Sequence, residues 1–461
     1  MDIQQLQGLI DTTAPLIVSI SIIFMIFSFF IRKIKRIPKQ HNEQLKESLP
    51  EDAHGIIFGK KGKNVIYSPS ENEGSVGVFS ASGTGKTSAV GIPTLRSWSG
   101  TSFTIDISGD ICKNCPDIQN KLIFEPESKD TIPYNIFGVI DNLNTQGDKN
   151  EALEQLAFLL MPPTAQNDNG KFFEDNGRKI LTASLIAFYS QGMDFIEICE
   201  KVVTSSYQDL FRAIDETQIK DAILYINSFE GTSEQNTSGC KQSCDDALKL
   251  FATNEKVKHS ILRPIDGEPY IQPNLIENYN IFVIIDDPKL TLYSPLLNII
   301  TSQMMQYISN RKVDENSKSI LLFLDEYASL KIDANTILEA LRKYRKRKCR
   351  VMILTQNLAD LELLYGAETT RALMSNLRFK VLLGGLAETQ SQKYFAELIG
   401  YKKTTKKSTS KNANSTTKTE SEEEEYIIAP ADLDRQGNDV VILIHPEKKG
   451  YMILKMNYYF L

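Results

Sequence analysis

Two short groups of residues have the types and spacing needed to bind a nucleoside triphosphate and hydrolyse it. The first is the pair of adjacent acids Asp325 and Glu326, which follows the apolar run at residues 321–324. Such a run is typical of a strand buried on both faces, so its carboxyl end is expected at the edge where α/β sheets bind ligands. There Asp325 could hold a hydrated Mg²⁺ and Glu326 could activate a water. This chemistry predicts a phosphate-binding loop elsewhere in the chain.

The second group, at residues 80–87, has the composition of that loop. It follows a β-prone run and ends in Gly85-Lys86-Thr87, the second half of the pattern G-x-x-x-x-G-K-[ST]. Lys86 would reach the β- and γ-phosphates, and the Thr87 hydroxyl would bind Mg²⁺. The residues expected to bind the cofactors ATP and Mg²⁺ are Ser82, Gly83, Thr84, Gly85, Lys86, Thr87 and Asp325, with Thr87 and Asp325 as the metal ligands. Ser80 stands where the pattern has its first glycine, and a glycine-rich turn with an exposed lysine is the alternative interpretation.

A glutamine and a basic run extend the candidate site. Gln356 follows the β-prone run at 351–354, so it could lie beside the phosphates and sense the γ-phosphate. Capping of the next helix by Thr355 or Asn357 can coexist with that role. Residues 342–350 hold seven cations in nine positions. This run could be a solvated helix end, a contact for nucleic-acid phosphates, or the source of an arginine for the active site of a neighbouring subunit.

The composition bounds the remaining possibilities. A chain of 461 residues suggests two or three domains, and its net charge of −6 provides no overall basic field. Any contact with nucleic acid therefore requires a local basic patch. The cysteine pairs Cys112/Cys115 and Cys240/Cys244 could supply zinc ligands, but their separation is far beyond the spacing of a zinc ribbon. Reduced thiols are the expectation.

The amino-terminal region predicts a membrane anchor. Residues 14–31 are apolar apart from serines and carry no charge, which is just long enough to cross a bilayer. Five cations follow within residues 32–39, so the positive-inside rule places the main body in the cytoplasm. We therefore expect a single-pass protein of the inner (cytoplasmic) membrane. A buried core helix is the alternative.

The elements that must position the site alternate between strand-like and helical patterns, which predicts an α/β fold with a mostly parallel sheet. Residues 40–73 are expected to form a polar lead into the first strand. Residues 402–425 are rich in Lys, Thr, Ser and Glu and have too little apolar content to pack, so a mobile loop is expected. The expected domains are 1–39 (membrane anchor), 40–190 (nucleotide-binding domain, first part), 191–262 (all-α domain) and 263–461 (nucleotide-binding domain, second part).

Several of these segments together resemble the coupling ATPases of type IV secretion and conjugation. Residues 324–328 look like the diacid motif of that family. Residues 106–110 are similar to its Asp-Pro-Lys-Gly-Glu segment, with Ser108 in place of the lysine. Arg345 and Gln356 stand at the arginine-to-glutamine spacing of the family.

The resemblance implies a RecA-like P-loop NTPase domain, an inserted all-α domain and an N-terminal transmembrane helix. It also implies an ATP hydrolase in a homohexameric ring, with Glu326 and Gln356 as catalytic residues and Arg345 as an arginine finger in trans. Members of the family bring relaxase-bound single-stranded DNA or effector proteins to a type IV secretion channel. Two alternatives stay open: a non-hydrolysing membrane receptor that docks secreted proteins, and a translocase of the same superfamily that pumps duplex DNA.

Overall fold

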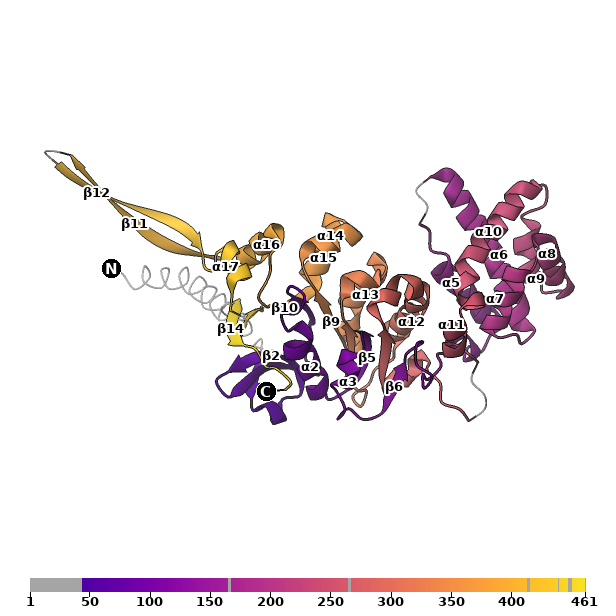
Figure 1. Cartoon of the computed structure of the whole chain (residues 1–461), viewed down its shortest axis with the longest axis horizontal. Coiled ribbons are helices and arrows are strands. Elements are labelled where there is room, and N and C mark those ends of the chain that lie inside the picture. Colours follow the sequence, from indigo (N-terminus) through magenta and orange to yellow (C-terminus); the bar gives the residue numbers. More distant parts are fainter. Residues whose placement is uncertain are drawn as a thin grey trace, which may run out of the picture. The chain divides into compact units, whose positions relative to one another are not determined.

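The computed structural model describes residues 44–164, 167–263, 267–412, 415–437, 439–446 and 450–460. The membrane helix expected at 14–31 lies outside these residues. Within them, no helix is both long and apolar enough to cross a membrane. The elements described below all belong to one unit of the chain, which begins at residue 45 (Figure 1).

Twelve strands of the described chain form one mixed sheet, in the order β1-β3-β2-β14-β13-β10-β4-β9-β8-β5-β7-β6. The strands are β1 (Lys46–Ser48), β2 (Gly55–Lys61), β3 (Asn64–Pro69), β4 (Ser75–Phe79), β5 (Thr101–Ile107), β6 (Lys121–Phe124), β7 (Asn280–Ile285), β8 (Ile320–Leu324), β9 (Cys349–Thr355), β10 (Leu377–Leu382), β13 (Val440–Ile444) and β14 (Tyr451–Lys455). From β10 to β6 in that order every pairing is parallel. The pairings from β1 to β10 are antiparallel. The α/β fold with a mostly parallel sheet is therefore confirmed.

The central strands are buried on both faces, as their apolar sequences predict. On β8, Ile320, Leu322 and Leu324 belong to one cluster of buried side chains, whereas Leu321 and Phe323 belong to another. The first cluster includes side chains of α12 (Leu290–Asn310), α13 (Ala334–Lys343), α14 (Leu358–Tyr365), α15 (Ala367–Asn376) and α16 (Thr389–Ile399). The second includes side chains of η2 (Lys86–Gly91), α2 (Ile92–Ser97) and α3 (Asp110–Lys113). Helices on both faces hold the carboxyl ends of the strands in place.

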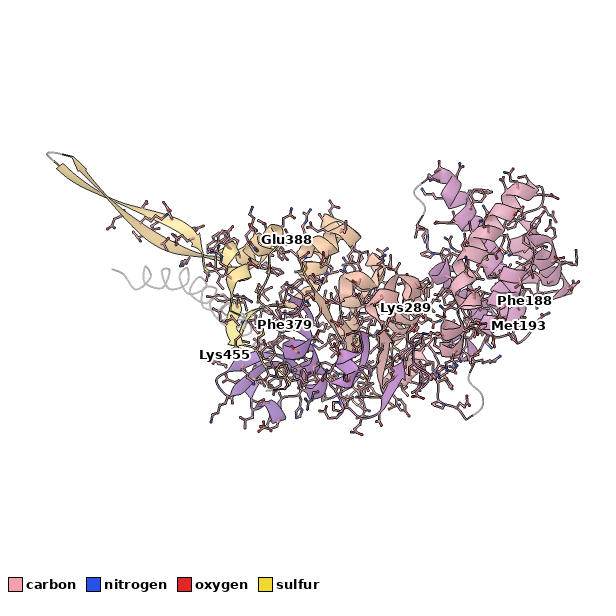
Figure 2. All side chains as sticks on the ribbon, viewed as in Figure 1. Phe188, Met193, Lys289, Phe379, Glu388 and Lys455 are labelled. Atoms are coloured by element: carbon pink, nitrogen blue, oxygen red, sulfur yellow. The ribbon has the colours of Figure 1, made fainter. Side chains whose placement is uncertain are left out.

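Residues 40–73, expected as a polar lead, instead supply β1, β2 and β3. Their apolar triplets at 56–58 and 65–67 are buried, and the Phe58 ring lies 5.2 Å from the ring of Phe379 on β10 (Figure 2). Two short triplets separated by a turn are a weaker signal than one long apolar run, which is why the sequence did not predict these strands. The turn is at Gly62, whose φ of 67° suits glycine.

A series of helices separates β6 from β7. They are α4 (Gly138–Asp141), α5 (Gln146–Leu160), α6 (Asp168–Ser190), α7 (Phe195–Thr204), α8 (Tyr207–Glu216), α9 (Lys220–Asn227), α10 (Glu234–Thr253) and α11 (Glu255–Ser260). The boundary expected at 190/191 falls between α6 and α7, which pack on each other, and α6 also packs on α9 and α10. Phe188 of α6 is fully buried, with the Lys201 ammonium 4.8 Å from its ring centroid (Figure 2). The helical insertion is present, while the division of the chain into domains stays a prediction.

Residues 401–426 form a β-hairpin, where the sequence suggested a loop. Its strands are β11 (Tyr401–Asn412) and β12 (Ser415–Tyr426), which pair only with each other. Lys402 and Lys403 of β11 lie opposite Glu425 and Glu424 of β12. Ion pairs join Lys403 to Glu422 at 3.7 Å and Lys406 to Glu423 at 2.5 Å. Cross-strand charge complementarity stabilises strands that have no apolar face to bury.

The remaining helix, α17 (Pro430–Arg435), precedes β13, and short turns lie at η1 (Pro50–Asp52), η3 (Pro273–Glu277), η4 (Asp287–Lys289), η5 (Tyr327–Leu330) and η6 (Tyr344–Arg347).

Candidate nucleotide-binding site

Four neighbouring parallel strands bring the predicted site residues to one edge of the sheet. The phosphate loop follows β4, Gln356 follows β9 and Asp325 follows β8, while Ser108 follows β5. In this order β9 lies between the strand of the loop and the strand of the two acids. A pocket of about 700 Å³ opens at this edge, and its lining includes Ser82, Gly83, Gly85, Lys86, Thr87, Asp325, Glu326 and Gln356. Segments far apart in the chain thus meet around one cavity.

The phosphate loop turns through two glycines in the left-handed region. Gly83 has a φ of 75° and Gly85 a φ of 104°, which other residues rarely adopt. Directly after them, η2 begins at Lys86 and continues into α2. The first N–H groups of such a helical segment have no intrahelical partner, so they are available to an anion at the loop.

Ser80 and Thr84 close the base of this loop. Ser80 is fully buried, and its φ is not in the left-handed region. Its hydroxyl contacts the Thr84 hydroxyl and donates to Gly384 O at 3.3 Å, while Thr84 Oγ1 donates to Ala81 O at 2.7 Å. A serine therefore fits where the pattern has its first glycine. Thr84 belongs to the loop but does not line the pocket.

Lys86 is a buried cation at the centre of the loop. Its Nζ donates to Ser80 O at 2.9 Å and to Ala81 O at 3.2 Å, and it lies 4.0 Å from Glu326 Oε1. Burial lowers the pKa of Lys86, and the nearby carboxylates of Glu326 and Asp325 act in the opposite direction. A desolvated ammonium with few counter-charges is well suited to bind phosphate oxygens.

Asp325 is 6% exposed, and its Oδ1 accepts no hydrogen bond among the described residues. Burial raises the pKa of Asp325 to about 7, with further contributions from Glu326 and Asp106. A buried carboxylate oxygen without a donor is costly unless a cation or a donor satisfies it. Together with the Thr87 hydroxyl, this oxygen fits Mg²⁺, which prefers oxygen ligands and keeps several waters.

The described residues contain no group of three or more His, Cys, Asp or Glu side chains placed to hold a metal ion. A Mg²⁺ at the pocket would take one or two protein ligands together with the substrate phosphates. The two cysteine pairs considered for zinc do not meet. Burial raises the pKa of the thiols Cys112, Cys115, Cys240 and Cys244, which favours their neutral form.

Asp106 is a buried acid close enough to influence Asp325, and the sequence did not assign it a role. It is fully buried on β5 and accepts from Cys112 N at 2.8 Å and from Ile111 N at 3.3 Å, at the start of α3. Burial raises the pKa of Asp106 to about 6 despite these bonds. An acid inside a strand with no other charged residue was the available signal. Ser108, two residues later, lines the pocket with a φ of 88°, an unusual conformation for a residue with a side chain.

Glu326 and Gln356 both line the pocket, as expected for groups that act on a water at the γ-phosphate. Glu326 has a φ of 42°, so the chain turns sharply after Asp325. The neighbouring Asn357 accepts from Asp360 N at 2.9 Å and caps α14. Capping therefore belongs to Asn357, which leaves the Gln356 side chain at the pocket.

Arg345 does not lie at this pocket. It belongs to η6, which precedes β9, and seven residues of strand, about 20 Å, separate it from the edge where Gln356 lies. Its side chain is 63% exposed and forms an ion pair with Glu73. Within one chain, Arg345 and the phosphate loop are thus on opposite edges of the sheet.

The rest of the basic run is partly structural. Arg350 is buried and donates to Pro69 O at 2.9 Å, Gly74 O at 3.0 Å and Ser68 Oγ at 3.1 Å. Arg347 donates to Arg311 O at 2.9 Å. The exposed cations of the run, by contrast, include Arg342, Lys343 and Lys346. Only this half of the run remains available to a nucleic acid or another subunit.

Comparisons with known proteins show the family and the fold of this chain. Residues 33–461 match the family model described as type IV secretory system conjugative DNA transfer. The bacterial conjugative coupling protein TrwBdeltaN70 has a similar structure, with a TM-score of 0.65 and 17% identity over 83% of this chain and 84% of that chain. The plasmid coupling protein TrwB in complex with ADP and Mg²⁺ gives a TM-score of 0.62 and 16% identity over 83% and 85%. Among curated protein sequences, none matches significantly.

Proposed function

Because the chain belongs to the type IV secretory system conjugative DNA transfer family, we propose that it is a coupling ATPase that moves substrates toward a type IV secretion channel. The observation that carries this proposal is the meeting of Lys86, Thr87, Asp325, Glu326 and Gln356 around one pocket. Structures of TrwB, which has a similar fold, in complex with ADP and Mg²⁺ and with a non-hydrolysable ATP analogue support the proposal that this chain binds a nucleotide.

Each residue has a defined task in ATP hydrolysis. Lys86 and the loop N–H groups bind the β- and γ-phosphates and offset their charge. Thr87 and Asp325 would hold Mg²⁺, which would neutralise charge on the phosphates. Glu326 accepts a proton from the attacking water or orients it, and Gln356 positions the γ-phosphate end of the substrate.

The catalytic assignment predicts two variants with different failures. Lys86→Ala should lose ATP binding and hydrolysis together, because the loop loses its cation. Glu326→Gln should retain binding and lose hydrolysis by about 100-fold or more, because the amide cannot accept a proton. Phosphate release and equilibrium ATP binding, measured on the purified full chain, separate the two steps.

The matched controls are the substitutions Lys220→Ala and Glu216→Gln at exposed positions of the helical insertion. Both should leave basal hydrolysis unchanged. Full hydrolysis by Glu326→Gln would show that this residue is not catalytic. Hydrolysis by Lys86→Ala at the wild-type rate would show that this pocket is not the site of hydrolysis.

The assembly that fits the position of Arg345 is a homohexameric ring, with ATP between subunits and Arg345 acting in trans. An exposed arginine on the edge opposite to its own pocket can serve only the pocket of a neighbour. A transmembrane helix at 14–31 would anchor this ring in the inner membrane beside the channel proteins.

The cargo is relaxase-bound single-stranded DNA, effector proteins or both. ATPase assays with single-stranded and duplex DNA distinguish this function from a duplex-DNA pump, which duplex alone would stimulate. A chain that binds ATP but does not hydrolyse it under any of these conditions would instead be a docking receptor.

A further inference from the structure

The segment that follows β14 is held against the phosphate loop. It begins directly after Lys455, which Figure 2 labels at the end of the strand. Met456 N donates to Asp439 O at 3.0 Å, and Tyr459 N donates to Ser88 O at 3.1 Å. A Cβ on Gly85 would lie 3.3 Å from the ring of Tyr458. The segment is therefore packed on the loop and on the first turn of η2.

Tyr459 brings an aromatic ring to the nucleotide pocket. Among the described residues that line this pocket, it is the one aromatic side chain. It also lines a second cavity of about 530 Å³, on the side of Pro93 and Arg96. Its ring is partly exposed and meets the ring of Phe460 edge to face, with centroids 5.1 Å apart. The ring thus stands at the boundary between two cavities, supported by a neighbour.

The polarity of a bound nucleotide points its base toward this ring. Glu326 must lie at the γ-phosphate because it acts on the attacking water, and Gln356 lies there because it positions the γ-phosphate. Lys86 and Thr87 bind the β- and γ-phosphates and the metal, so the α-phosphate and ribose leave the loop beside the next residue, Ser88. Ser88 is the residue whose carbonyl holds Tyr459.

We propose that Tyr459 is the base-stacking residue of the nucleotide site, with the purine lying on its ring next to the first turn of η2. This inference rests on the proposed function, since it requires the phosphates at Lys86. Stacking on an aromatic ring uses the flat face that every base has, and its loss typically weakens binding by about tenfold or more.

The test is equilibrium binding of two probes, ATP and inorganic tripolyphosphate, to the purified full chain with Mg²⁺. Tyr459→Ala should bind ATP about tenfold more weakly and tripolyphosphate as tightly as the wild type, because only ATP carries a base. Tyr459→Phe keeps the ring and should restore ATP binding. Tyr279→Ala, a partly exposed tyrosine that does not line the pocket, is the matched control and should change neither affinity.

Each outcome decides one question. Equal losses for both probes in Tyr459→Ala would mean that the segment only supports the loop and would overturn the stacking role. Unchanged ATP binding would overturn it as well. A wild-type chain that binds neither probe would instead overturn the nucleotide site itself. Lys86→Ala, which is expected to lose binding of both probes, is the reference for this outcome.

Discussion

The carboxyl group of Asp325 is buried where two further acids, Glu326 and Asp106, are close. Its pKa is therefore high because ionisation would place charge in a poorly solvated site next to other negative groups. The pKa of Lys86 is shifted in the opposite direction, since burial disfavours its charged form. Bound phosphates and a metal ion relieve both, because each supplies the missing counter-charge.

This burial predicts a pH effect on the metal-free protein. The pKa of Asp325 rises from 3.8 to about 7 on folding, so between these values the native state binds the extra proton. Stability should then fall as pH rises from about 4 to about 7. Asp325→Asn cannot ionise and should flatten this loss, as measured by thermal unfolding in a chelator. An equally steep fall of stability with pH in Asp325→Asn would show that Asp325 is not the group responsible.

The buried Arg350 predicts a structural effect within the basic run. Arg350→Leu leaves the carbonyls of Pro69 and Gly74 and the Ser68 hydroxyl without their donor. The free energy of unfolding should fall by about 2–4 kcal/mol, as measured by denaturant titration. The exposed Arg342→Leu is the control and should stay within about 0.5 kcal/mol.

Single residues were predictable where chemistry and a strand end coincide in the sequence. Asp325, Glu326 and Gln356 follow directly after β8 and β9, Lys86 and Thr87 end the loop that follows β4, and all five line one pocket. Tyr459 reaches the same pocket only through the path of the segment after β14. A single sequence carries no direct signal for this arrangement, since it depends on distant pairings.

At the scale of elements, the strands with long apolar runs were predictable and those without were not. Burial on both faces makes β4, β8 and β9 mostly apolar, and their apolar runs make them visible in the sequence. The hairpin β11–β12 has almost no apolar residue, so composition alone suggested a loop. Its stability comes from pairing between strands, which depends on register rather than on composition.

The hairpin should be dispensable for folding. It pairs with no strand of the large sheet, and an isolated two-stranded ribbon adds little stability. Replacing residues 403–424 by Asn-Gly keeps the stacked pair Tyr401 and Tyr426 at its base. We expect the free energy of unfolding to change by less than about 1 kcal/mol and ATP binding to stay intact. A collapse of the thermal transition would show that the hairpin supports the core.

At the scale of the whole molecule, the position of Arg345 is decisive. Arg345 lies at the amino ends of the strands, whereas the pocket of the same chain lies at their carboxyl ends. An active site that uses Arg345 therefore needs at least two chains. A mixing experiment tests this directly. Arg345→Ala and Glu326→Gln should each be inactive alone, but randomly mixed rings should recover part of the wild-type rate, at most about a quarter, because a quarter of the interfaces combine an intact pocket with an intact arginine.

The exposed Arg342→Ala should remain active alone and serves as the control. No recovery in the mixture would argue against a shared site, and full activity of Arg345→Ala by itself would exclude the residue from catalysis.

Strand β9 connects these scales, because it has Gln356 after its carboxyl end and η6 with Arg345 before its amino end. It is buried along its whole length and hydrogen-bonded to a strand on each side, which makes it a stiff rod rather than a hinge. In a ring, loss of the γ-phosphate at the carboxyl end of β9 would displace its amino end, where the next subunit begins. Successive subunits would then hydrolyse ATP in order rather than independently, because β9 would couple each active site mechanically to the next.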